Sequence, residues 1–104
     1  MKTIKKWQKE FAKAAVRKFP ANKKWKEQDR LLSILRQLAD VGGGIQKEKN
    51  IFPHPNKAYD DPNHRLAALL ADILILVDKR GFNLDKELGE VLKWYKRKNV
   101  PLSK

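Results

Sequence analysis

One aspartate interrupts an otherwise apolar stretch that runs from Leu66 to Val77. A carboxylate in the centre of a buried segment must be hydrogen-bonded, paired with a cation or bound to a metal, because burying it bare costs several kcal/mol or more. The stretch is shorter than the roughly 20 apolar residues that cross a bilayer. It therefore predicts a core helix, and Asp72 is the first place to look for chemistry.

Length and cysteine content limit the class of protein. A chain of 104 residues fits one domain, so we expect residues 1–104 to form a single helical domain. The absence of cysteine excludes disulfides, thiolate metal sites and thiol catalysis. The first residues lack the features of a signal peptide, and with no membrane-length segment we expect a cytoplasmic protein that does not enter a membrane.

The net charge of +12 is concentrated at the two ends of the chain. Residues 1–30 contain eleven basic and three acidic residues, and residues 91–104 contain five basic and no acidic residues. Basic ends attract polyanions such as nucleotides or nucleic acid. The alternative is a lysine-rich surface that only keeps the protein soluble, and charge alone does not choose between the two.

Apolar residues recur at helical spacing along most of the chain. The first helix should end at Phe19-Pro20, because a residue before proline is pushed out of the α region. Asn22 is a candidate N-cap for the second helix. The low helix propensity of Gly42–Gly44 predicts that this helix ends at Val41. Tertiary packing could instead extend the helix toward Lys47. Its expected inner face comprises Leu31, Ile34, Leu35, Leu38, Val41 and Ile45.

A loop is expected over residues 46–62, followed by two more helices. Asp61-Pro62 is a start signal for the third helix and Gly81 a stop signal. Asn83 should cap the fourth helix, whose apolar stripe comprises Leu84, Leu88, Val91, Leu92 and Tyr95. The pattern predicts an all-α four-helix bundle. Because the third helix is apolar on every side except at Asp72, we expect a partner chain to cover it in a homodimer or higher oligomer.

The order of short motifs resembles the MazG-type all-α nucleoside triphosphate pyrophosphohydrolases. The resemblance covers residues 4–99 and rests on four fragments, namely Trp7-Gln8, the segment from Leu35 to Gly42, Leu70-Ala71-Asp72-Ile73-Leu74, and the segment from Gly81 to Lys93. It implies the family's helical bundle and cleavage of a nucleoside triphosphate to the monophosphate and pyrophosphate. The family holds Mg²⁺ with the motif E-E-x-x-E on one helix and E-x-x-D on the next.

Most of these acidic positions are replaced in this chain. The first motif reads Ala39-Asp40-Val41-Gly42-Gly43, and the second runs from Leu69 to Asp72. The resemblance therefore implies Asp40 and Asp72 as the remaining Mg²⁺ ligands, and Lys93 and Arg97 as phosphate-binding residues. With so few ligands left, it implies a pyrophosphohydrolase whose activity is weakened or lost.

Each candidate residue has a structural alternative. Asp72 could form a buried ion pair with Arg65, Lys79, Lys93 or Arg36, and Asp40 could be a solvated helix residue. Ser33 has no base nearby in sequence, and neither His54 nor His64 has a partner at zinc spacing. Trp25 could stack on a nucleobase or pack in the core. The alternative function is a non-catalytic module that binds a nucleotide or nucleic acid through its basic surface.

Overall fold

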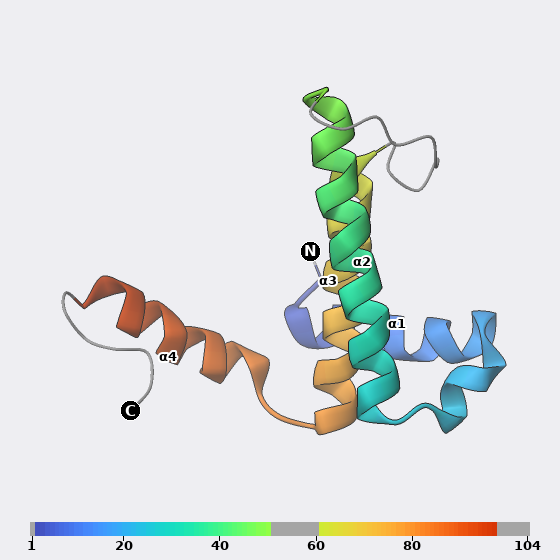
Figure 1. The fold of residues 1–104 in the computed structure, drawn as a ribbon. Coiled ribbons are helices and arrows are strands. Elements are labelled where there is room, and N and C mark those ends of the chain that lie inside the picture. The colour runs from blue at the N-terminus through green and yellow to red at the C-terminus, as the bar shows by residue number, and fades with distance from the viewer. Residues whose placement is uncertain (1, 51–60, 98–104) are drawn as a thin grey trace.

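The chain folds into helices throughout the part that the structure describes. The structure is a computed structural model and describes residues 2–50 and 61–97. The elements are α1 (Ile4–Lys18), the short 3₁₀ helix η1 (Pro20–Lys24), α2 (Glu27–Glu48), α3 (Pro62–Arg80) and α4 (Leu84–Lys96) (Figure 1). Since these ranges contain no strand, the all-α prediction with four α-helices is confirmed. None of the described helices is long and apolar enough to cross a bilayer.

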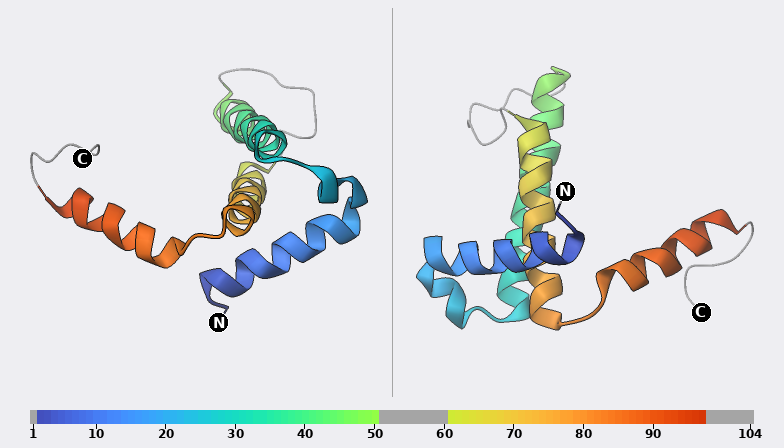
Figure 2. Two further views of the ribbon diagram at one scale, coloured as in Figure 1. Left: turned by 90° about the horizontal axis from the view of Figure 1, so that it is seen from below. Right: turned by 180° about the vertical axis from the view of Figure 1, so that it is seen from behind.

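The helices α2 and α3 run antiparallel and side by side, and α1 crosses α3 (Figures 1 and 2). At one end of the pair, Arg80 of α3 lies 3.0 Å from Glu27 of α2. The carboxylate of Asp78 on α3 holds α1, because it lies 2.9 Å from Lys9 Nζ and accepts a 3.3 Å hydrogen bond from the buried Gln8. Polar contacts between helices therefore fix the arrangement at this end of the molecule.

Most of the predicted boundary signals are confirmed. Helix α1 ends with Phe19 as its C-cap, directly before Pro20. Asp61 caps α3 and accepts a hydrogen bond from the His64 N–H, and Asn83 caps α4 in the same way. Gly81 ends α3 at a φ of 69°, in the left-handed region where a glycine has no Cβ to clash.

The predicted start of the second helix is wrong. Asn22 lies inside η1, and α2 begins only at Glu27. The side chain that caps the start of α2 comes from inside the helix, because the Asp29 carboxylate accepts a 2.8 Å hydrogen bond from the Lys26 N–H. Pro20 favours the tight turn of η1, which displaces the helix start by four residues and frees the Asn22 side chain for another partner.

The three glycines do not end α2, which continues to Glu48. Three glycines within a helix cost about 1 kcal/mol each relative to alanine. Gly43 and Gly44 are buried, as is Val41, and we attribute the continuation to this packing. The expected loop over 46–62 is therefore wrong at its start, and residues 51–60 lie outside the described part of the chain.

The apolar residues are less buried than the sequence predicts. Among the described residues, the buried hydrophobic side chains are Val41, Leu69, Leu74 and Val77. The expected inner face of α2 is mostly wrong, because Leu31, Leu35, Leu38 and Ile45 are exposed in the single chain. Val41 is buried as expected, and the other buried residues of α2 are Arg30, Gly43 and Gly44.

Helix α4 projects away from the other helices rather than completing a bundle with them (Figures 1 and 2). The radius of gyration is 16.2 Å, whereas about 13 Å is typical of a compact domain of 100 residues. The predicted apolar stripe of α4 is exposed from Leu88 to Tyr95. Within one chain, therefore, α1, α2 and α3 pack together and the fourth helix does not close the bundle.

Candidate functional site: a buried ion pair beside a basic groove

Asp72 is buried where α3 faces α2, with 5% of its surface exposed. Its Oδ1 accepts a 2.6 Å hydrogen bond from Arg30 Nη1, and its Oδ2 accepts a 2.6 Å hydrogen bond from the Ser33 hydroxyl. The cation that neutralises Asp72 is therefore Arg30, and not one of the four basic residues that the sequence suggested. Both carboxylate oxygens have a protein donor.

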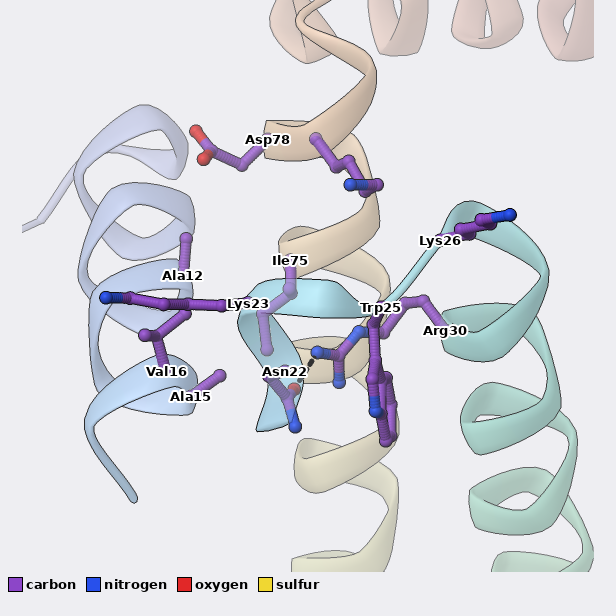
Figure 3. A pocket seen from close by; sticks show the side chains of 11 residues that line it. Ala12, Ala15, Val16, Asn22, Lys23, Trp25, Lys26, Arg30, Ile75 and Asp78 are labelled. Carbon is purple, nitrogen blue, oxygen red and sulfur yellow. Dashed lines mark hydrogen bonds between the residues drawn. The ribbon is translucent and has the colours of Figure 1, made fainter. Parts of the chain in front are cut away.

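The Arg30 guanidinium is held on three sides. Besides its bond to Asp72, it donates through Nη2 to Asn22 Oδ1, and it lies over the Trp25 ring with its central carbon 4.6 Å from the ring centre. Figure 3 shows the Asn22 contact and the position of Trp25 beside the guanidinium. Only 9% of the Arg30 side chain is exposed, so this pair is a true interior ion pair.

The local sequence explains how these groups meet. Arg30 and Ser33 are three residues apart on α2, so both side chains project from the same face. The turn at η1 brings Asn22 and Trp25 back over that face. The sequence contains one signal that could have identified Arg30 as a buried residue. Positions 30, 33, 37, 41 and 44 recur at helical spacing and therefore share one face of α2. This line puts an arginine on the buried face of α2.

A groove of about 810 Å³ opens beside the ion pair, between α1, η1, α2 and α3. This volume falls in the range of ligand pockets, about 300–1,000 Å³. Trp25 and Arg30 also border a second cavity of about 330 Å³, which Figure 3 shows. The larger groove is lined by Phe11, Ala14, Ala15, Lys18, Phe19, Ala21, Asn22, Trp25, Arg30, Ser33, Arg36, Gln37, His64, Ala67, Ala68, Ala71, Asp72 and Ile75.

The lining of this groove is apolar with a positive charge. Its acidic lining residue is Asp72, which Arg30 already neutralises, while Lys18 and Arg36 remain as further cations. Within the described ranges, Arg36 forms no ion pair. The Gln37 side-chain oxygen is buried without a hydrogen-bond partner in this part of the chain. The groove therefore offers aromatic surface and cations.

The residues present do not fit a Mg²⁺ site. Magnesium requires near-ideal octahedral coordination by oxygen, and both oxygens of Asp72 are already bound by Arg30 and Ser33. Asp40 lies seven residues beyond Ser33 on α2, about 10 Å along the helix axis. No group of three or more potential ligand residues is found over residues 2–50 and 61–97.

The other residues implied by the resemblance are not brought together either. Lys93 and Arg97 belong to α4 and its C-cap and do not line the groove. Lys93 is 66% exposed and lies 3.6 Å from Glu90 of the same helix. Trp25 and His64 do line the groove, whereas His54 is outside the described residues. Of the predicted site residues, the structure therefore places Asp72 and Trp25 at one site.

No protein-family model matches this chain, and neither a characterised protein nor a solved structure is significantly similar to it. The geometry of the groove and of the ion pair therefore carries the functional argument.

Proposed function

We propose that this protein is a non-hydrolysing nucleotide-binding module, and that the groove beside Arg30 and Asp72 takes the nucleotide. The observation that carries the proposal is the Asp72–Arg30–Trp25 arrangement: a guanidinium fixed by a buried carboxylate and stacked on an aromatic ring at the wall of a basic groove. A pocket that combines aromatic surface with cations fits a ligand with a flat ring and a phosphate.

The two parts of such a ligand meet different residues. Trp25, Phe11 and Phe19 supply aromatic surface for a base, and stacking of a base on an aromatic side chain contributes about 1–3 kcal/mol. The cations Lys18 and Arg36 supply charge for a phosphate, and the planar guanidinium of Arg36 suits bidentate contact with phosphate oxygens. The resemblance to the MazG-type family supports a nucleotide as the ligand.

The same groove does not support metal-assisted hydrolysis. A triphosphate bound with Mg²⁺ needs several free carboxylate oxygens to hold the metal. Here the Arg30 guanidinium already occupies an oxygen of Asp72 that a metal ion would need. The positive charge that remains for a phosphate comes from Lys18 and Arg36. We expect binding in the absence of divalent metal, with an affinity that falls as salt rises.

The test is calorimetric titration of the full chain with ATP and with AMP in EDTA, at two salt concentrations. We expect both to bind, and we expect Trp25→Ala and Arg36→Gln each to weaken binding by on the order of 10-fold. The matched controls are on α4: Tyr95→Ala removes an exposed aromatic side chain, and Lys93→Gln removes an exposed cation. Neither control should change the affinity.

Three results would overturn the proposal. Absence of ATP and AMP binding at low salt is the first. The second is loss of binding in Lys93→Gln but not in Arg36→Gln, which would move the phosphate site to α4. The third is release of pyrophosphate from a triphosphate with Mg²⁺, which would make the protein an enzyme. Binding of an oligonucleotide that Trp25→Ala leaves unchanged would favour a nucleic-acid surface elsewhere.

A further inference from the structure

The second cavity, of about 330 Å³, lies between α1, η1, the start of α2 and the C-terminal half of α3. Figure 3 shows α1 on one side of it and Trp25 and Arg30 on the other. Its volume is at the lower end of the range for ligand pockets, about 300–1,000 Å³. The cavity and the nucleotide groove have a common wall, which consists of Ala15, Asn22, Trp25, Arg30 and Ile75. The cavity is therefore a second, smaller compartment that the proposed nucleotide site does not use.

Short aliphatic side chains keep this space open. Ala12, Ala15 and Val16 line it from α1, where their spacing of three and four residues places them on one helix face. Ile75 lines it from α3 (Figure 3). All four residues are half-buried, so the cavity contains apolar surface that a ligand can cover. Because covering apolar surface is favourable, this wall favours a ligand with a compact hydrocarbon body.

The charged residues of the lining leave a positive charge that the described chain does not balance. Arg30 is paired with Asp72, and Asp78 lies 2.9 Å from Lys9 Nζ and accepts a hydrogen bond from Gln8. Three further cations come from three segments, and none of them forms an ion pair within residues 2–50 and 61–97. They are Lys23 of η1, Lys26 at the N-cap of α2 and Lys79 of α3. An anionic group at this cavity is therefore favoured by Coulomb attraction.

We infer that the second cavity binds a small organic anion, with a compact hydrocarbon body on the aliphatic wall and one anionic head near the lysines. A lysine ammonium is a compact point charge that pairs with a carboxylate or with a phosphate. A neutral ligand gains nothing from the lysines, and an inorganic anion leaves the aliphatic wall in water. Phe11 and Phe19 line the groove but not this cavity, so a nucleobase has more aromatic surface in the groove. The two compartments therefore suit different ligands.

The experiment uses three probes with the same branched carbon skeleton: 3-methylbutanoate, 3-methylbutyl phosphate and the neutral 3-methylbutan-1-ol. Each probe is titrated into the full chain in EDTA at low salt, and the NMR signal of the Trp25 indole N–H is followed. The variant Trp25→Phe assigns this signal, because the chain has three tryptophans. We expect at least one of the two anions to bind with a Kd on the order of 1 mM, and the alcohol to bind about 10-fold more weakly. The comparison of the two anions identifies the preferred head group.

Ala12→Leu and Ala14→Leu form a matched pair of variants on α1. Of the two compartments, Ala12 lines only the cavity and Ala14 lines only the groove. Ala12→Leu should therefore fill part of the cavity and weaken anion binding by on the order of 10-fold, whereas Ala14→Leu should leave it unchanged. Because leucine is nearly as good a helix former as alanine, both variants should keep the helical circular-dichroism spectrum.

A second pair of variants tests the charge. Lys23→Gln with Lys79→Gln should weaken anion binding about 5-fold, because both side chains line the cavity but are exposed to solvent. Lys86→Gln with Lys93→Gln removes the same charge from α4 and should leave binding unchanged. Failure of both anions to shift the Trp25 signal overturns the inference, as does equal binding of the alcohol.

Two results with the variants also overturn the inference. The first is anion binding that Ala12→Leu leaves unchanged, or that Ala14→Leu weakens as much, because the anion would then not be in the cavity. The second is an equal loss in the two lysine pairs, because the effect would then be one of net charge alone. Nucleotide binding in the groove is measured separately by calorimetry, so either proposal can fail without the other.

Discussion

Replacement of Asp72 by asparagine tests whether this carboxylate is a structural counter-ion or a metal ligand. The substitution keeps the shape of the side chain but removes its charge. In the structure it leaves the Arg30 guanidinium 9% exposed and without a carboxylate. The Ser33 hydroxyl loses its charged acceptor at the same time.

The expected cost is large relative to the stability of the domain. Removing one partner of a buried ion pair costs about 3–5 kcal/mol, because the other charge stays buried and unpaired. A domain of this size is stable by only about 5–15 kcal/mol. Ser33→Ala removes one hydrogen bond to the carboxylate and should cost less, about 1.5–3 kcal/mol. Replacing both charges, with Arg30→Met and Asp72→Leu, should recover most of the loss.

Urea unfolding followed by circular dichroism, at one protein concentration throughout, measures these values. With a slope near 2 kcal/mol per M, Asp72→Asn should lower the midpoint by about 2 M. Magnesium should leave the midpoint of the unaltered protein unchanged, whereas a metal site filled at 100 times its Kd would add about 2.7 kcal/mol. A cost below about 1 kcal/mol for Asp72→Asn, or stabilisation by Mg²⁺ that this variant abolishes, would refute the counter-ion interpretation.

Three further predictions concern the helices and are checked by the same unfolding experiment. Gly42→Ala should stabilise the protein by about 0.5–1 kcal/mol, whereas Gly81→Ala should destabilise it by about 1 kcal/mol, because both sites have open space but only Gly81 has a positive φ. Asp61→Ala removes the cap of α3 and should cost about 1 kcal/mol. Glu27→Gln removes the exposed pair with Arg80 and should cost less than about 1 kcal/mol. An equal effect at both glycines, or a larger loss in Glu27→Gln than in Asp61→Ala, would contradict this reasoning.

The sequence predicts the features that neighbouring residues determine. Asp61-Pro62, Gly81 and Asn83 mark helix ends through contacts within one turn, and the structure confirms all three. The continuation of α2 through Gly42–Gly44 depends on what packs against the glycines, so local propensity gives the wrong end. Asn22 fails as a cap for a related reason, because Pro20 starts a 3₁₀ turn that precedes the helix.

The partner of Asp72 depends on the whole fold. Arg30 lies 42 residues away in sequence, and it reaches Asp72 only because α2 and α3 are antiparallel in one particular register. The apolar pattern of α2 points to the wrong face as well: the leucines suggest the core, whereas Arg30, Ser33 and Gln37 face the groove.

The pairing of Asp72 with an arginine limits what the site can do. A bound Mg²⁺ ion keeps water molecules that chemistry can use, whereas a guanidinium already hydrogen-bonded to Asp72 and Asn22 offers no such water. It contributes a flat surface stacked on Trp25, and Asp72 balances its charge. The arrangement of the ion pair therefore agrees with the binding function proposed above, in which Lys18 and Arg36 of the groove meet the anion.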